Sequence, residues 1–404
     1  MLLNQNSVER KDKDVQGGHP ESESIGRQQK TTILRDYPNS NPYDTKPGEK
    51  PYKLEIKWPY VFIFAYFHVA FVIAIFTPIT ARTFLWGFMY GVVSSYGVTA
   101  GAHRYWAHKC YKVTRPLFFI FLFFQTTSLQ YSVIDWVRNH RVHHKYSDTN
   151  ADPHNSCRGF FFSHIGWLMC KKHPDVKKYG QRVDISDLTS DPVLRFQKKY
   201  YYLLAMVCTF LLPIFLFMYF FDLSFWTAYH WHIFRYILSL HLTLSVNSVS
   251  HSWGSKPFEK DIKATDTFTI GLLAFGEGWH NYHHVYPYDY KASELPGCWW
   301  NTTTLFIDFF VWLGWAYDLK TVSDEMVRRR VLRTGDGSHR YSIEEKQKTT
   351  KELVQSCTGE CNDGEGEKLK TTADHISDHY WGWGDDDMLQ VDINDAKIIN
   401  PKDE

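Results

Sequence analysis

The sequence predicts an all-α integral membrane protein in which four transmembrane helices are capped by a cytosolic helical domain that holds a metal site. Four apolar runs interrupt an otherwise polar chain, and each is close to the ~20 residues needed to span a bilayer. The motif His-x-x-His-His occurs twice, in polar stretches outside these runs. We expect a polar arm over residues 1–50, a membrane domain over 51–338 and a polar C-terminal tail over 339–404.

Composition narrows the class of protein further. The chain has 404 residues with 45 Lys and Arg against 44 Asp and Glu, so no overall charge favours a nucleic-acid partner, and we expect none. Aromatic residues make up 17%, which is typical of membrane proteins. The 7 cysteines are scattered without zinc-ribbon spacing, and we expect them to be reduced. Cys357 and Cys361 could pair or bind metal, but their polar surroundings favour a disordered segment.

The first two spans are predicted over residues 60–76 and 83–102. Residues 1–50 contain no apolar signal region and are predicted to be a disordered arm. The loop between the spans carries only Arg82, whereas basic residues flank both outer ends. These flanking residues are Lys46, Lys50, Lys53, Lys57, Arg104, Lys109, Lys112 and Arg115. Because basic residues are enriched on the cytosolic side, the N-terminus and the chain after the second span are expected there.

A shorter apolar run over residues 117–129 is too short to span and predicts an interfacial or buried helix. The third and fourth spans are predicted over 201–221 and 225–246, with Lys198 and Lys199 placing the start of the third in the cytosol. Residues 103–200 and 247–338 are then the cytosolic catalytic parts, so all the histidine motifs share one side of the membrane. The chain after Trp315 turns polar and is expected to be mostly solvated.

The histidine motifs predict a metal centre. His140, His143 and His144 are spaced i, i+3 and i+4, so on a helix they fall within a wedge about 100° wide. The same spacing recurs in His280-Asn281-Tyr282-His283-His284, and His103 and His108 precede both motifs. Scattered interfacial histidines are the simpler alternative, but two identical motifs and an earlier pair favour a shared site. Eight histidines exceed the needs of one metal ion, so we expect a dinuclear site.

Imidazole ligands suit zinc, copper, iron or nickel, so ligand type does not select the metal. No histidine motif contains a cysteine, which argues against a closed structural zinc site. A redox metal beside a membrane indicates oxygen activation on an apolar substrate. That chemistry favours two iron ions as the cofactor.

Several longer stretches around these histidines resemble one known family. They are TAGAHRYWAH (99–108), HRVHHKYSDTNADPHN (140–155), GFFFSHIGWL (159–168), NSVSH (247–251), GEGWHNYHH (276–284) and RTGDGSH (333–339). Residues 52–338 resemble the membrane fatty acyl-CoA desaturases of the stearoyl-CoA, or Δ9, type. The ending WGWGDDDM (381–388) is similar to the insect branch of that family. We assign no function to the insertion that precedes it.

The resemblance implies which residues bind metal. It adds His251 and Asn247 to the eight histidines, with Asn247 acting through a water molecule. The implied ligand set of two irons is His103, His108, His140, His143, His144, His251, His280, His283, His284 and Asn247.

The resemblance also implies the reaction and its partners. The expected activity is introduction of a cis double bond into a saturated fatty acyl-CoA, using O2 and electrons from cytochrome b5 and its NADH-dependent reductase. No HPGG haem motif is present, so cytochrome b5 is expected to be a separate protein. We expect a multi-pass protein surrounded by lipids of the endoplasmic reticulum membrane, with both termini and the site cytosolic. The expected bond position is Δ9, with Δ11 or another position as alternatives.

The resemblance further implies residues that bind the substrate. They form a bend in an acyl tunnel (Gln130, Trp136, Thr243), contacts to the CoA head (Arg138, Lys171, Lys172) and the methyl end of the tunnel (Gly91, Ser95). A solvated basic face is the alternative for the two lysines. The chain departs from the family pattern at Tyr131 and Asn139 near the CoA, at Leu244 beside the bend, and at Gly91, where a bulky aromatic is usual.

Two other functions remain open at this point. A histidine-box hydroxylase or decarbonylase shares two metals and four spans, although GEGWHNYHH and NADPHN favour desaturation. A metal transporter would need ligands inside its spans. The histidines within or beside the spans belong to no motif, and Arg235 in the fourth span would repel a cation. The sequence leaves the chain length of the substrate and the physiological role open.

Overall fold

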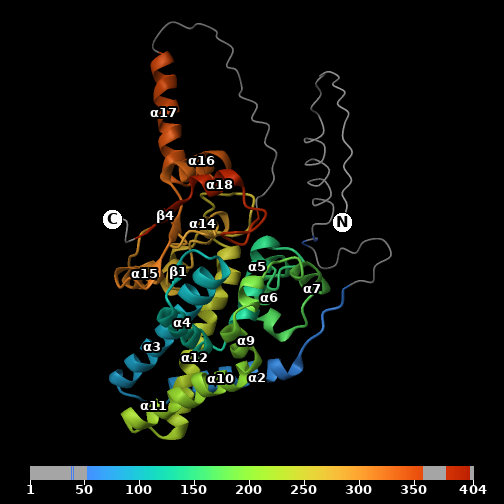
Figure 1. Ribbon diagram of the computed structural model, residues 1–404, viewed down its shortest axis with the longest axis vertical. Helices are drawn as coiled ribbons and strands as arrows, with labels where there is room; N and C mark the ends of the chain where they lie inside the picture. The colour runs from blue at the N-terminus through green and yellow to red at the C-terminus, as the bar shows by residue number, and fades with distance from the viewer. Residues whose placement is uncertain (1–37, 39, 41–51, 358–378, 401–404) are drawn as a thin grey trace, which may run out of the picture. The chain divides into compact units, whose positions relative to one another are not determined.

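The computed structural model describes residues 38, 40, 52–357 and 379–400, without the side chains of 352–357. The chain divides into two units, Met1–Asn39 and Ser40–Glu404, and every labelled helix and strand belongs to the second (Figure 1). The predicted N-terminal arm and Cys361 therefore lie outside the described residues, apart from Pro38 and Ser40. The five cysteines whose side chains are described are free thiols, in agreement with the prediction.

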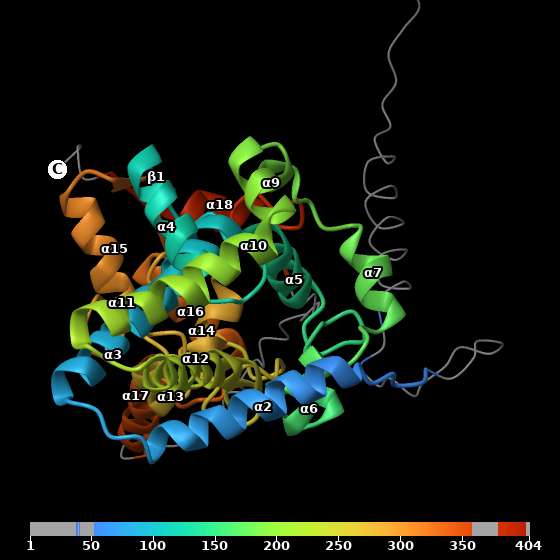
Figure 2. The ribbon, with the colours of Figure 1, turned by 90° about the horizontal axis from the view of Figure 1, so that it is seen from below.

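Four long helical segments match the four predicted spans, and two of them are long and apolar enough to cross a membrane, Trp58–Ile75 and Tyr201–Phe221. The first segment is α2 (Trp58–Ile75), and the second is α3 (Ala81–Tyr96) continued by the π-helix η1 (Gly97–Ala107). The third comprises α10 (Tyr201–Ala205), the π-helix η4 (Met206–Leu211) and α11 (Leu212–Phe221), and the fourth is α12 (Phe225–Ser248). α12 packs against α2, α3 and α11, as Figure 2 shows for α2.

Local chemistry sets the ends of these helices. Pro59 stands in the first turn of α2, where its missing N–H would have had no helical partner. The hydroxyls of Thr80 and Ser224 cap α3 and α12 by accepting from the backbone N–H three residues later. Asp222 adopts a left-handed conformation (φ 51°) and ends α11, so the chain reverses directly into α12.

The part of the chain outside the four long segments is built on α4 (Arg115–Thr127), the short apolar helix that the sequence predicted. Leu117, Phe118 and Phe121 of α4 are buried in one core with Val133 and Ile134 of α5 (Val133–Lys145). α4 packs against η1, and α5 packs against η1 as well. The two helices thereby fix the segment that carries the first two motif histidines.

Shorter elements complete this part of the structure. The helices are η2 (Ser156–Arg158), α6 (Phe160–His164), η3 (Gly166–Met169), α7 (Pro174–Gly180), α8 (Ser186–Thr189), α9 (Pro192–Lys199), η5 (Val249–His251), α13 (Phe268–Leu273), α14 (His280–Val285), α15 (Thr302–Trp312), α16 (Asp324–Thr334), α17 (Arg340–Cys357) and α18 (Gln390–Asp395). Two antiparallel pairs join β1 (Lys112–Val113) to β2 (Ala316–Tyr317) and β3 (Leu319–Thr321) to β4 (Lys397–Ile399).

The C-terminal tail differs from the prediction of a mostly solvated segment. Tyr380 and Trp381 are only 4% and 2% exposed, and β4 pairs with β3. The prediction was wrong for this stretch because its aromatic side chains bury apolar surface against the rest of the described chain. Most described residues of α17, by contrast, are exposed, as a solvated segment would be.

Candidate metal centre

All nine predicted histidine ligands gather into two neighbouring clusters. In each cluster the potential ligand atoms lie within 4.8 Å of one another. The first cluster has five members, His103, His108, His140, His144 and His283. The second has four, His143, His251, His280 and His284. All nine side chains are buried or half-buried.

The two His-x-x-His-His helices divide their histidines between the clusters in opposite ways. Helix α5 gives the i, i+4 pair His140 and His144 to the first cluster and His143 to the second. Helix α14 gives its i, i+4 pair to the second cluster and His283 to the first. Residues four apart are neighbours on a helix surface, so each pair meets one cluster while the remaining imidazole reaches the other.

The π-helix η1 explains the wider spacing of the first two histidines. The N–H of His108 donates to the carbonyl of His103 over 3.1 Å, which is the five-residue hydrogen bond of a π-turn. The wider turn brings residues five apart toward the same face, and the two rings lie 4.8 Å apart. π-bulges inside helices are frequent at functional sites.

Hydrogen bonds at Nδ1 determine the tautomers of four ligands. The Nδ1 atoms of His103, His143 and His251 donate to Glu277 (2.8 Å), Asp152 (2.8 Å) and Asp148 (3.1 Å), respectively. His108 Nδ1 donates to the backbone carbonyl of Trp381. A carboxylate or carbonyl oxygen can only accept, so the proton is on Nδ1 and the Nε2 lone pair is bare. Metal-binding histidines are commonly held in this way.

The Nε2 atoms of facing histidines lie at short distances from one another. These are 2.9 Å for His103–His283, 2.8 Å for His108–His140, 3.0 Å for His251–His280 and 3.2 Å for His143–His284. Two nitrogen ligands about 2.1 Å from a metal and at right angles to each other would be about 3.0 Å apart. Several imidazole nitrogens converge at about this spacing in each cluster, so both clusters fit a bound metal ion.

Electrostatics keep most of these imidazoles in the neutral form that a metal requires. Burial, together with repulsion between neighbouring imidazoles, holds the pKa of six of them well below the usual value. These six are His108, His140, His144, His280, His283 and His284. Burial alone would raise the pKa of Glu277, but Arg104 and His103 lower it to about 2, so the carboxylate stays ionised and supports His103.

A series of cavities passes beside the clusters. The largest of the three, about 260 Å³, is lined by Tyr60, Gln130, Tyr131, Trp136, Asn139, His140, Thr243, Leu244 and Asn247, among others. It shares Trp136, His140, Thr243 and Asn247 with a cavity of about 60 Å³ that also touches His103, His143, His280 and Ser95. That cavity shares Ser239, Leu242 and Phe275 with a third, of about 50 Å³, which reaches Gly91.

The residues predicted to shape a bend lie together at the middle of this path. The side-chain amide of Gln130 donates to the Thr243 hydroxyl over 3.1 Å. The Trp136 indole stacks on the His140 ring at 4.8 Å. Asn247 is half-buried and lines the path without belonging to either cluster.

Of the three predicted CoA-binding residues, Lys172 is the one that contacts a residue lining the cavity path. The Lys172 ammonium donates over 2.5 Å to the side chain of Asn139, which lines the cavity of about 260 Å³. Lys171 pairs with Glu55 on the exposed surface at 2.5 Å. Arg138 lies next to Gly180 of α7 and lines none of the three cavities.

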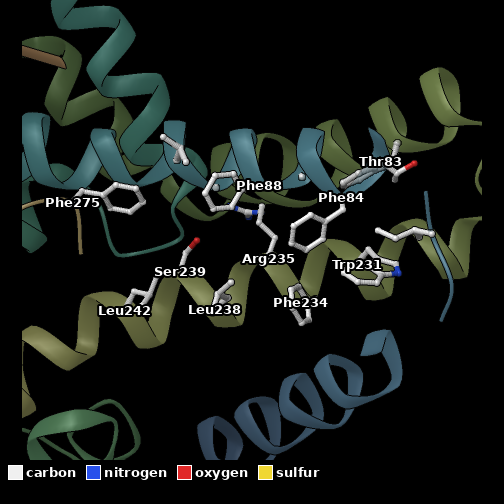
Figure 3. Close-up of a pocket in the computed structure, with 15 residues that line it drawn as sticks. Thr83, Phe84, Phe88, Trp231, Phe234, Arg235, Leu238, Ser239, Leu242 and Phe275 are labelled. Atoms are coloured by element: carbon white, nitrogen blue, oxygen red, sulfur yellow. The ribbon is translucent and has the colours of Figure 1, made fainter. Parts of the chain in front are cut away.

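Figure 3 shows the narrow end of the path, between α3 and α12. Phe84, Phe88 and Trp231 surround it, and the Arg235 side chain extends from α12 toward α3 (Figure 3). A Cβ atom on Gly91 would lie 3.3 Å from Arg235 Cγ, so the methylenes of Arg235 already occupy the space beside the glycine. The Ser95 hydroxyl donates to the Gly91 carbonyl and lines the middle cavity.

Sequence reasoning did not identify the groups that hold the histidines in place. Asp148, Asp152 and Glu277 lie inside the motif strings but at no regular spacing from the histidines they support. Arg104 was noted only as a flanking charge, yet it is fully buried and pairs with Glu277 at 2.8 Å. The only available signal was a carboxylate near each histidine motif.

Comparison with known proteins agrees with this geometry. A family model described as fatty acid desaturase matches residues 78–302. The chain is 46% identical over 320 residues to an acyl-CoA Delta(11) desaturase of Spodoptera littoralis, covering 78% of this chain and 95% of that protein. The chain belongs to the acyl-CoA desaturase family. It is therefore an oxidoreductase of the membrane desaturases, and the hydroxylase and transporter alternatives are set aside.

Two further relatives show how far this assignment extends. An acyl-CoA Delta-9 desaturase of Acheta domesticus is 42% identical, covering 90% of this chain and 91% of the relative. An acyl-CoA Delta12-desaturase of the same species is 47% identical, covering 74% of this chain and 85% of the relative. These desaturases are named for three different bond positions at similar identity. Family membership thus establishes the reaction and an acyl-CoA substrate for this desaturase, but not the bond position.

Proposed function

We propose that the two clusters bind two iron ions through their nine histidines, with Asn247 acting through a water molecule. The observation that supports this most strongly is the convergence of imidazole Nε2 atoms at 2.8 to 3.2 Å within each cluster. Supporting carboxylates hold three of the histidines, as is common at histidine metal sites. When bound, the irons supply the oxidising chemistry by which O2 is reduced to water and two hydrogens leave adjacent methylene groups.

In this proposal the protein's own residues choose which methylenes react. Neighbouring methylenes of an acyl chain are chemically alike, so only their position can distinguish them. Gln130 and Thr243 form the bend by their mutual hydrogen bond, and Trp136 lines the path beside His140. Gly91 and Ser95 receive the methyl end. The product is a cis-unsaturated acyl-CoA with the double bond at Δ9, and Δ11 or another position is the alternative.

The CoA head is proposed to bind Arg138, Lys171 and Lys172. Its phosphates match guanidinium and ammonium donors. Lys172 contacts Asn139 at the wide end of the path, which supports entry of the acyl chain from that side. The distance from this anchor to the bend would then set the bond position.

We propose that residues 51–338 form the membrane domain, with four spans in the endoplasmic reticulum membrane and both termini in the cytosol. Large apolar side chains on α2 and α11 are exposed, including Phe62 at 67% and Phe215 at 60%, which supports contact with membrane lipids. Electrons are proposed to come from cytochrome b5 and its NADH-dependent reductase. The metal clusters and the predicted CoA residues would then face the same compartment as these partners.

Expression in yeast lacking its own desaturase, followed by mass spectrometry of the fatty acids, tests activity, bond position and chain length together. We expect restored growth and cis double bonds at one main position. Purified protein should contain two irons per chain. Growth rescue without iron, or iron without any new double bond, would contradict the proposal.

A further inference from the structure

The segment Tyr380–Trp383 near the C-terminus, termed the C-terminal clamp, contacts the chain beside all three histidine motifs. We propose that the clamp is part of the metal centre and holds His108 in its metal-binding orientation. This inference rests on the proposed function of the clusters as metal sites. It assigns a role to the WGWGDDDM ending, for which the family resemblance implied none.

The clamp makes two hydrogen bonds with His108. His108 Nδ1 donates to the carbonyl of Trp381, and the N–H of Trp383 donates to the His108 carbonyl over 3.0 Å. The first bond keeps the imidazole proton on Nδ1 and leaves Nε2 bare toward His140. The second bond fixes the backbone that carries the imidazole.

Two further anchors tie the clamp to the other motifs. Lys145, which directly follows His144, pairs with Asp385 at 3.0 Å, and Asp385 in turn accepts from the Trp381 N–H at 2.9 Å. The Tyr380 hydroxyl donates over 3.1 Å to the carbonyl of Val285, which directly follows His284. Each anchor therefore lies one residue beyond a His-x-x-His-His motif.

The buried side chain of Trp381 anchors the clamp by packing on Arg141. It is 2% exposed, and the Arg141 guanidinium lies 3.9 Å from its ring, a cation–π contact. Arg141 stands inside the second histidine motif and donates to the carbonyls of Trp106 and Ala107 beside the first. The Trp381 indole thus covers the buried Arg141 guanidinium, which links the first two histidine motifs.

Glycine at position 382 is required by the close approach. Gly382 has φ +147°, and a Cβ there would lie 2.7 Å from both the Cα and the carbonyl oxygen of His108. Gly384 also has positive φ, +86°, but a Cβ there would meet nothing within 4 Å. The two glycines therefore form a matched pair, because alanine is strained at both but clashes with His108 at only one.

The clamp has a specific consequence for one cluster. Among the four ligands whose Nδ1 proton is held by an acceptor, three are held by carboxylates between residues 148 and 277, and His108 is held by the C-terminal end. Loosening the clamp should release metal from the five-histidine cluster and leave the four-histidine cluster loaded. A merely structural tail would affect both clusters together.

Full-length Gly382→Ala and Gly384→Ala proteins test this directly. Iron per chain, the rate of iron loss to a chelator and the Mössbauer spectrum are measured beside wild type, with the melting temperature as a check on folding. We expect Gly382→Ala to lower metal affinity at one site by about 10- to 100-fold, taking iron from about two to about one per chain. Gly384→Ala should keep both irons and the wild-type spectrum.

A second variant covers the case in which Gly382→Ala does not fold. Asp385→Asn removes the ion pair of Asp385 to Lys145, which keeps its pair with Asp387 at 2.8 Å, and introduces no backbone clash. We expect faster iron loss from the same single site. Two firmly held irons with an unchanged spectrum in both Gly382→Ala and Asp385→Asn would overturn the clamp, as would equal loss from both sites. A wild-type protein without iron would instead overturn the proposed function.

Discussion

The metal centre and the narrow end of the cavity path both use the helical segment formed by α3 and η1, yet they are built in opposite ways. At His103, in η1, the ring is fixed by the Glu277 carboxylate, and its Nε2 faces His283 at 2.9 Å. At Gly91, in α3, the surroundings are mostly apolar side chains and the methylenes of Arg235. Reactivity therefore depends on individual polar atoms at the metal centre. The selection of acyl-chain length depends on the volume of the cavity beside Gly91. Mutations at the metal centre should abolish desaturation, whereas mutations beside Gly91 should only shift the preferred acyl-chain length.

The strongest test at the metal centre is the substitution His143→Ala. We expect loss of desaturation and of bound iron, because an apolar side chain cannot replace an imidazole that binds metal and pairs with Asp152. His164→Ala is the control, since His164 contacts Ser248 and His241 but none of the nine predicted ligands. Product formation and iron content are measured for both. Equal losses in the two variants would contradict the assignment.

Asp152→Asn asks whether supporting carboxylates matter as much as ligands. The amide keeps the shape but weakens the hold on the His143 tautomer, so we expect a fall of about 10- to 100-fold in metal affinity or activity. Asp135→Asn is a matched control on the neighbouring helix α5, where the carboxylate contacts Ser132 and Lys198 and is partly exposed. Metal titration of both proteins measures the difference. A similar small effect in both would show that His143 needs no support.

The predicted CoA site should respond in binding rather than in chemistry. Lys171→Glu with Lys172→Glu is expected to raise KM for acyl-CoA more than it lowers kcat, because contacts far from the reacting carbons supply mainly uniform binding. The effect should shrink at high salt. Lys177→Glu with Lys178→Glu, an exposed pair on α7, controls for the change in net charge. An unchanged KM at low ionic strength would show that Lys171 and Lys172 form only a solvated surface.

Gly91→Tyr tests the narrow end of the cavity path. Of these substitutions, it should have the smallest effect on total activity. The added ring must displace Arg235 or fill the path, so we expect a preference for shorter acyl chains with unchanged iron content. Each excluded methylene should cost about 0.8 kcal/mol, which is about fourfold in affinity. Product chain lengths in yeast measure the shift. An unchanged profile, or joint loss of fold and iron, would identify Gly91 as a packing residue between α3 and α12.

Local spacing was enough to predict much of this desaturase. The apolar runs predicted all four long helical segments within a few residues, because hydropathy and helix length are local properties. The i, i+3, i+4 spacing predicted that His140, His143 and His144 converge, and they do lie at the clusters. His251 follows no local pattern, and only the family resemblance indicated it. The prediction of a solvated tail was wrong at Trp381, because the polar composition around this residue did not indicate that its side chain is buried.

Only the tertiary structure decided how these parts meet. Helical spacing puts three imidazoles on one face but does not say that His143 joins a different cluster from His140 and His144. It also does not pair His103 with Glu277, or His108 with a carbonyl 273 residues further along the chain. Such contacts join segments far apart in sequence, and their geometry is set by the packing of α5, η1 and α14 rather than by any residue period. The sequence therefore determined the helices and the metal-binding residue types, and the fold decided their division, their tautomers and their support.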